Sequence, residues 1–273
     1  MSKDSEDTTM DFRNFKQCTE LVLPADLKGK AIEAAVNERS DNLLMPGMMP
    51  IGLNSMAVAT SNKASTPAIS VLIAQKWASG RTLKVRFLGS PTQKVKDTIE
   101  FYAHEWEQFV NVKFLFGDDP NAEIRISCTL GDGSWSYLGT DALVIAKNRP
   151  TMNYGWFVDN TPEEEFSRTT LHEFGHALGA IHEHQHPIAG IPWNRPIVYD
   201  YYRRTQGWSK EDVDAQLFFK YDLNQTNSSQ YDKASIMHYA IEEKLLLDPS
   251  FAVGWNKKLS STDKSFMKTV YPF

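Results

Sequence analysis

One stretch of this chain, residues 171–187, constrains its fold and chemistry more than any other. It reads Leu-His-Glu-Phe-Gly-His-Ala-Leu-Gly-Ala-Ile-His-Glu-His-Gln-His-Pro. On a helix, His172 and His176 lie one turn apart, so both imidazoles project from one face and can bind the same ion. Gly179 can take the left-handed conformation that ends a helix, and the returning chain then brings up His182. We expect these neutral imidazoles to bind one zinc ion and to leave one coordination position open for water.

Glu173, between the first two histidines, is the candidate general base. A carboxylate at this position falls short of the metal but reaches a water molecule bound to it. An open coordination position beside a carboxylate is typical of a hydrolytic site rather than of a structural zinc site.

The full spacing matches the metzincin signature, His-Glu-x-x-His-x-x-Gly-x-x-His, at His172, Glu173, His176, Gly179 and His182. A second segment, Ser235-Ile236-Met237-His238-Tyr239, resembles the methionine turn of astacins. With Glu183 and the helix sequence His-Glu-Phe-Gly-His-Ala-Leu-Gly, these segments make residues 80–273 similar to astacin-like zinc endopeptidases of the microbial branch.

The resemblance implies an α+β fold of the metzincin type with two lobes. A twisted mixed β-sheet and the active-site helix would form the upper lobe, about residues 70–182, and residues 183–273 an irregular lower lobe. Residues 1–69 would be an N-terminal arm or a propeptide-like segment. Met237 would form an apolar floor beneath the histidines, and Tyr239 would be an additional zinc ligand that moves to stabilise the oxyanion.

The implied activity is zinc-dependent hydrolysis of polypeptides that lie extended along an edge strand near Trp135 to Gly139. Two alternatives remain open. One is a zinc-bound binding or effector module without catalysis, against which the intact Glu173 and Tyr239 argue. The other is a latent enzyme whose first 70 or so residues cover the cleft.

Cys18 and Cys128 are the cysteines of the chain, which excludes a disulfide framework. Two free thiols are the favoured interpretation, one bridge is an alternative, and a zinc-capping Cys18 thiolate in a latent form is another. His184, His186 and His238 fall outside the three-ligand template, and we expect them to be structural or on the surface.

The composition narrows the class of partner. A formal net charge of -5 and a pI near 5.8 give no electrostatic footprint for nucleic acid or an acidic membrane. The first residues lack the apolar core of a signal peptide, and no run is apolar enough to span a bilayer. We therefore expect a protein or peptide substrate and a monomer; the resemblance implies secretion, while a cytosolic protein stays an alternative.

Periodicity predicts the remaining elements. We expect strands at 83–88, 112–116, 124–127 and 152–157, and an exposed edge strand within 131–139. Helices are expected within 25–42, from Ser90-Pro91 to Val110, and at 198–204, 212–221 and 259–271, with a linker at 43–67. Thr161 is expected to cap the active-site helix, and Ser261 or Thr262 the last helix.

Overall fold

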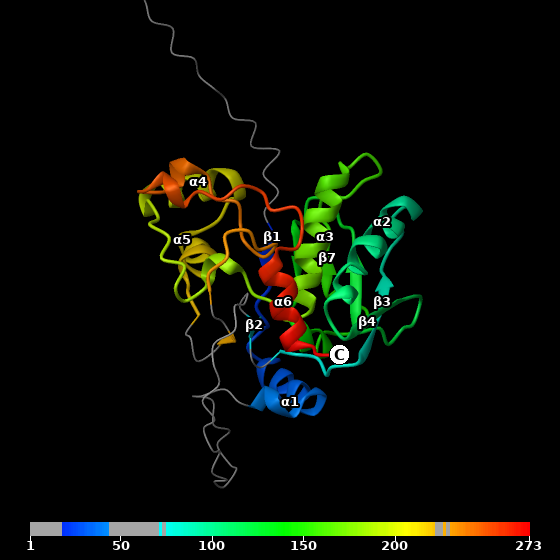
Figure 1. Ribbon diagram of the computed structural model, residues 1–273. Helices are drawn as coiled ribbons and strands as arrows, with labels where there is room; N and C mark the ends of the chain where they lie inside the picture. The colour runs from blue at the N-terminus through cyan, green and yellow to red at the C-terminus, as the bar shows by residue number, and fades with distance from the viewer. Residues whose placement is uncertain (1–17, 44–70, 73–74, 222–225, 228–229) are drawn as a thin grey trace, which may run out of the picture.

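The computed structural model describes residues 18–43, 71–72, 75–221, 226–227 and 230–273, and Figure 1 shows their arrangement. A lobe of sheet and helices stands on one side and a lobe of short helices and loops on the other. Between them run α3 (Glu163–Ala177) and α6 (Ser261–Val270). The predicted α+β class is confirmed. The linker expected at 43–67 lies outside the described residues, apart from its first residue.

A six-stranded mixed sheet forms the first lobe. Its order is β1 (Cys18–Glu20), β6 (Ser134–Ser136), β7 (Met152–Asn153), β5 (Ile124–Ser127), β3 (Arg81–Phe87) and β4 (Val112–Phe116). Neighbouring strands run parallel except β6 and β7. Two further strands, β2 (Val71–Leu72) and β8 (Thr226–Asn227), pair antiparallel as a separate sheet.

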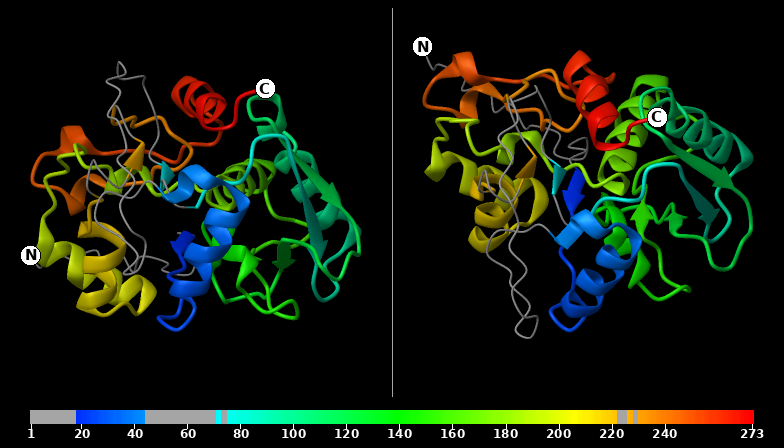
Figure 2. Two further views of the ribbon diagram at one scale, coloured as in Figure 1. Left: turned by 90° about the horizontal axis from the view of Figure 1, so that it is seen from below. Right: turned by 60° about the horizontal axis from the view of Figure 1, so that its bottom comes forward.

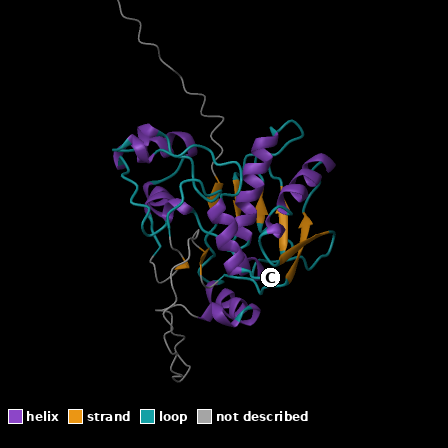
Figure 3. Ribbon diagram, viewed as in Figure 1, coloured by secondary structure: helices purple, strands orange, loops and turns teal. Residues whose placement is uncertain are grey.

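The main core lies between this sheet and the helices α2 (Gln93–Ala103), α3 and α6, which Figure 3 shows beside the strands. Val95 and Ile99 of α2 are four residues apart and both buried, and Phe166 and Phe174 of α3 are eight residues apart and both buried. Spacings of four and eight residues keep each pair on one helix face, so both helices turn an apolar face toward the sheet.

Helix boundaries differ from the prediction in α2, α3 and α6, and the helices expected at 198–204 and 212–221 also begin and end elsewhere. The helix expected to reach Val110 ends at Ala103, and Trp106 begins the 3-10 helix η3 (Trp106–Gln108). The Trp106 indole N–H donates to the carbonyl oxygen of Leu171 (3.0 Å), which ties this segment to α3. Thr161 does not cap α3, since its hydroxyl donates to the Trp156 carbonyl and accepts from the Val158 N–H. The last helix is capped by Ser260, in a capping box with the Asp263 side chain, rather than by Ser261 or Thr262.

The expectation of an exposed edge strand within 131–139 is wrong, because β1 covers β6. Cys18 lies opposite Ser134 and Glu20 opposite Ser136, with both strands running in the same direction. An uncovered edge would present unpaired N–H and C=O groups, and β1 satisfies those of β6.

The helix predicted within 25–42 is present as α1 (Lys28–Glu38), followed by the 3-10 helix η2 (Ser40–Leu43). It packs on the 3-10 helix η4 (Gly139–Leu143), and Leu23, Ala31 and Ile145 form a small core beneath it. The Asn42 side chain bonds both the N–H and the C=O of Lys76. The left view of Figure 2, seen from below, shows α1 beside the first lobe.

The second lobe is built on α4 (Arg195–Gln206) and α5 (Lys210–Val213). α5 continues directly into a π-helix, Asp214–Phe218. Short 3-10 helices, Glu183–Gln185, Glu243–Leu245 and Pro249–Phe251, complete the lobe. Its core consists of buried aromatic and aliphatic side chains, among them Val198, Tyr202, Val213, Leu217 and Leu245. Among the described residues, every helix is too short or too polar to cross a membrane.

Candidate zinc centre

The helix α3 and the turn that follows it bring three histidines together. His172 and His176 stand one turn apart on α3, and Gly179, with φ of 88°, turns the chain so that His182 returns to them. The candidate ligand atoms of the three side chains all lie within 4.8 Å of one another, and the Nε2 atoms of His176 and His182 are 3.0 Å apart. All three side chains are buried.

Two backbone carbonyls set the orientation of the first two imidazoles. The Nδ1 of His172 lies 2.8 Å from the Ile236 carbonyl oxygen, and the Nδ1 of His176 lies 2.7 Å from that of Ala180. Because a carbonyl only accepts, each Nδ1 carries the proton and each Nε2 presents its lone pair to the centre.

Burial keeps these imidazoles neutral. It lowers the pKa of His176 to about 4, against which the hydrogen bond to Ala180 acts. The pKa values of His172 and His182 also lie well below the ordinary value, mainly through burial and then through the neighbouring histidines. Neutral imidazoles with converging lone pairs are the state that a zinc ion requires of its ligands.

Unsatisfied buried atoms mark the same place. The Nε2 of His172 and both carboxylate oxygens of Glu173 make no hydrogen bond within the described part of the chain. A buried polar group without a partner is costly, and a cation with its bound water would satisfy these atoms. The three histidines therefore fit one zinc ion.

Glu173 is fully buried beside the histidines. Burial raises its pKa to about 8, against the smaller influences of Cys18 and Arg168. The ligand atoms of Cys18, His172 and Glu173 form a second group within 4.8 Å of one another, so the thiol of β1 reaches the centre. The sequence alone did not favour this placement of Cys18.

Met237 lies under α3, where the resemblance expects an apolar floor. It is fully buried, and a Cβ built on Gly175 of α3 would lie 2.4 Å from its Sδ atom. The helix therefore approaches the methionine as closely as a glycine allows.

Asp263 of α6 holds the methionine turn, a role that the sequence analysis missed. It accepts hydrogen bonds from the Ser235 hydroxyl (2.7 Å) and the Ile236 N–H (2.8 Å). The carbonyl of Ile236 in turn orients His172. The available signal was the capping-box spacing from Ser260 to Asp263.

Tyr239 lies against the third histidine. Its ring centroid is 4.2 Å from that of His182 and 4.3 Å from that of His184, on which it stacks. Burial raises the pKa of its phenol well above the ordinary value, so the hydroxyl stays a donor. It donates to the backbone carbonyl of Cys18.

The other histidines near the centre are buried and make structural hydrogen bonds. His184 Nε2 lies 2.7 Å from the Gln216 carbonyl oxygen, and His238 Nε2 lies 2.6 Å from the Tyr231 hydroxyl. His186 Nδ1 accepts from a backbone N–H two residues later. We expected each of these histidines to be structural or on the surface. All three are buried, so none lies on the surface.

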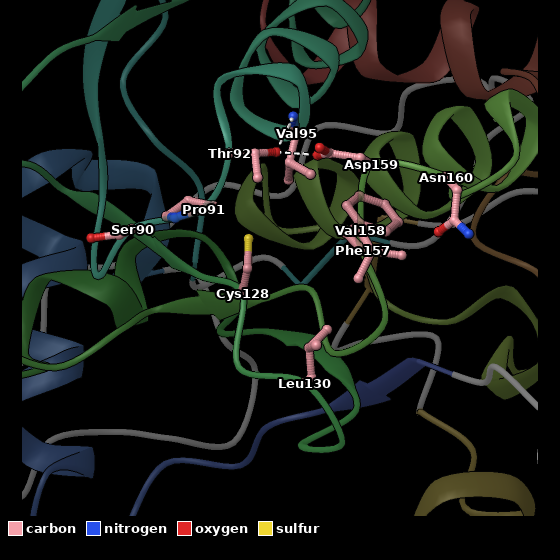
Figure 4. A pocket seen from close by; sticks show the side chains of 10 residues that line it. All are labelled: Ser90, Pro91, Thr92, Val95, Cys128, Leu130, Phe157, Val158, Asp159 and Asn160. Atoms are coloured by element: carbon pink, nitrogen blue, oxygen red, sulfur yellow. Dashed lines mark hydrogen bonds between the residues drawn. The ribbon is translucent and has the colours of Figure 1, made fainter.

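Both cysteines are free thiols, so the alternative of a bridge is wrong. Cys18 sits at the histidines, whereas Cys128 points into a separate cavity of about 450 Å³, shown in Figure 4. Leu130, Phe157 and Val158 make this cavity largely apolar, and Thr92 bonds Asp159 across its rim. The histidines do not line it.

Comparison with solved structures places the chain in a family. One structure of myroilysin is 49% identical, with a TM-score of 0.73, and the match covers 75% of this chain and 98% of that one. The chain belongs to the astacin-like zinc metallopeptidases. A second myroilysin structure is 47% identical over 73% of this chain and 87% of its own, with a TM-score of 0.58. The astacin-like resemblance and the metzincin-type fold predicted from the sequence are thereby confirmed.

Curated relatives of this astacin-like chain are more distant. The zinc metalloproteinase dpy-31 of Caenorhabditis elegans is 26% identical over 211 residues, and that of Brugia malayi 28% over 211. Each match covers 72% of this chain but 32% of the relative, so the chain spans about a third of their length. No protein-family model matches the sequence.

Proposed function

We propose that this astacin-like chain is a zinc endopeptidase in which Glu173 is the general base. The observation that carries the proposal is the convergence of three neutral imidazoles on a point beside the buried carboxylate of Glu173. Zinc held by His172, His176 and His182 supplies a Lewis acid that polarises a peptide carbonyl and lowers the pKa of water.

The protein's own groups then handle the proton and the developing charge. Glu173 accepts a proton from the attacking water and delivers it to the leaving amine nitrogen. Tyr239, released from the carbonyl of Cys18, donates its phenolic hydrogen bond to the oxyanion of the tetrahedral intermediate. Both side chains are buried, where such interactions are stronger than in water.

We further propose that the substrate is a polypeptide in extended conformation. The pairing of β1 along β6 supports this, because it places a strand across the histidines with its backbone satisfied by the sheet. A peptide that replaced β1 would gain the same backbone bonds, which favours polypeptides over small molecules.

Substitution of Glu173 by Gln tests the general base. Peptide hydrolysis should fall at least about a hundredfold, since a carboxamide cannot accept the proton. Zinc content, measured by elemental analysis, should stay at the wild-type level. Glu164→Gln, an exposed position on the same helix, is the matched control and should keep its activity. An active Glu173→Gln variant would refute this mechanism.

A specific observation also favours a latent state of the same enzyme. The Cys18 thiol lies within 4.8 Å of the His172 and Glu173 ligand atoms, and its own carbonyl engages Tyr239. Thiolate is a strong zinc ligand. We propose that Cys18 takes the coordination position that the attacking water needs, while β1 fills the substrate strand position.

Latency is tested on the full chain with Cys18→Ala, using Cys128→Ala as the matched control. The full chain and the control should cleave a peptide library weakly, and Cys18→Ala should cleave it at least about tenfold faster, since thiolate binding to zinc is lost. Equal activity of all three proteins would end the latency proposal and leave the endopeptidase proposal intact. A further outcome is that each protein holds zinc but none cleaves a peptide, even after removal of the first 67 residues. This outcome would favour a non-catalytic binding role over the endopeptidase proposal.

A further inference from the structure

Gln216 bonds the backbone of β1, the strand that lies beside the histidines. It lies in the π-helix of the second lobe, and its side-chain Oε1 accepts from the Glu20 N–H (3.4 Å) while its Nε2 donates to the Glu20 carbonyl oxygen (3.1 Å). The other edge of the same strand pairs with β6, where Glu20 lies opposite Ser136. In Figure 1, β1 accordingly runs between α3 and the lobe that carries α5.

We propose that Gln216 is a positioning residue for the backbone of an extended polypeptide substrate. The inference rests on the endopeptidase proposal. A substrate strand in the place of β1 would pair with β6 along one edge and with the Gln216 side chain along the other, so its backbone would be fixed from both edges.

The chemistry of a carboxamide suits this role. In an extended residue the N–H and the C=O point to the same edge, and a primary amide offers one acceptor and one donor to match them. A half-turn about the last side-chain bond exchanges the two, so Gln216 can pair with a chain that runs in either direction. A carboxylate offers acceptors alone, and an aliphatic side chain offers neither.

The segment that follows the third histidine holds Gln216 in place. His184 Nε2 donates to the Gln216 carbonyl oxygen (2.7 Å), and Gln185 Nε2 donates to that of Ala215 (3.0 Å). Ala215 and Gln216 lie in the last turn of this helix, where carbonyls lack partners within the helix, and these two side chains satisfy them. Because His184 and Gln185 closely follow His182, one short segment positions both a candidate zinc ligand and the helix that carries Gln216.

The first test uses the full chain and the reactivity of the Cys18 thiol. Cys18 is 2% exposed within β1, so alkylation requires β1 to separate from β6 and the histidines. Gln216→Leu loses both backbone hydrogen bonds, and Gln216→Glu loses the one to the Glu20 carbonyl and places a carboxylate against that oxygen. Each variant should therefore raise the alkylation rate of Cys18 about tenfold, with that of Cys128 unchanged. Gln206→Glu, in the same lobe, controls for the added charge. Unchanged Cys18 rates in both Gln216 variants would overturn the inference.

The second test uses the form of the chain that cleaves peptides, with substrates in which one amide at a time is replaced by an ester. An ester removes a single N–H. Wild type should show a penalty of about fivefold at the subsite that Gln216 contacts, and Gln216→Leu should lose that penalty while KM rises about tenfold and kcat stays within about twofold.

The outcomes separate the two proposals. A chain that cleaves no unmodified peptide refutes the endopeptidase proposal and the substrate role with it. A chain that cleaves, but shows the same ester penalties with Gln216 and with Leu, refutes the substrate role of Gln216 alone. Loss of one penalty in the variant supports direct contact, because a merely structural defect would slow all substrates alike.

Discussion

At the scale of single residues, the histidines depend on main-chain groups that no substitution of a partner side chain removes. His172 is oriented by the carbonyl of Ile236 in the methionine turn, and His176 by the carbonyl of Ala180 after Gly179. A carbonyl cannot change its charge, so the proton stays on Nδ1 across pH. The orientation of the two imidazoles therefore depends most on the residues that position the methionine turn and the turn at Gly179.

Gly175→Ala tests how closely the methionine turn approaches α3. The new Cβ would lie 2.4 Å from Met237 Sδ and 3.4 Å from the Trp106 ring, so Met237 must move. Overpacking should outweigh the gain in helix propensity and lower the free energy of unfolding by about 1–2 kcal/mol. Chemical denaturation of the zinc-loaded protein measures it.

Gly29→Ala in α1 is the matched control, because nothing lies within 4 Å of its added Cβ. It should be neutral or raise the free energy of unfolding by up to about 1 kcal/mol. If Gly175→Ala proves as stable as the wild type, the tight packing between α3 and Met237 is not a constraint on the fold.

The three histidines and Glu173 could be predicted because they form a local pattern. Their spacing follows from the helical repeat and one glycine turn, which the sequence displays directly. The roles of Asp263 and Gln216 could not, since each depends on an element that packs against a distant segment. Asp263 serves a turn 27 residues earlier in the chain, and Gln216 contacts a strand 196 residues away.

At the scale of elements, the predictions succeeded where alternation was strong. The bounds of β4 and β5 agree with the sequence, because apolar residues recur at every second position beside polar ones. In contrast, β1 consists of three residues, Cys18–Glu20, which are too few to show a period. Its position is set by β6, more than a hundred residues later.

Aromatic donors outside α3 also shape this helix. The indole N–H of Trp77 donates to the Ala177 carbonyl (2.7 Å), and the Tyr271 hydroxyl donates to that of Leu178 (2.7 Å). The last carbonyls of a helix otherwise lack partners. Side chains from distant segments thus secure the end of α3 just before the turn that returns His182.

At the scale of the whole molecule, the N-terminal residues that the structure describes touch both lobes. Glu20 bonds Gln216 and Tyr221 of the second lobe, while the strand that contains it pairs with β6 of the first lobe. Arg39 donates to the Val270 carbonyl at the end of α6. Removal of β1 would therefore release contacts between the lobes as well as expose the histidines.

The buried Asp141 of η4, beneath this N-terminal region, should make stability depend on pH. Burial raises its pKa from 3.8 to about 7, opposed by Gln75, so the folded chain favours the neutral acid. The contribution of the protonated Asp141 to the free energy of unfolding is therefore fully present below about pH 4. This contribution is lost as the pH rises to about 7. Asp141→Asn lacks this loss, so between pH 5 and 7.5 it should gain about 2–3 kcal/mol on the wild type.

Urea unfolding of both proteins at several pH values measures the difference between their free energies of unfolding. Taking this difference cancels the pH dependence of the titratable groups that both proteins contain. Burial raises the pKa of Glu20 to about 7, with the Tyr221 hydrogen bond acting against it and a small repulsion from Asp141 adding to it, and the titration of Glu20 remains in both proteins. Asp118→Asn, at an exposed position, controls for the loss of one carboxylate. A pH-independent gap between wild type and Asp141→Asn would contradict the prediction.

The zinc content of the purified full chain tests the central claim most directly. Elemental analysis after dialysis against a weak chelator should find one zinc per chain in the wild type and in His104→Ala, whose imidazole lies at the end of α2 away from the site. His176→Ala, made together with Cys18→Ala so that the thiol cannot replace the lost imidazole, should hold less than about a tenth of an equivalent, because two imidazoles bind zinc far more weakly than three. Undiminished zinc in this double variant would show that the ion is held elsewhere and that the centre described is not the zinc site.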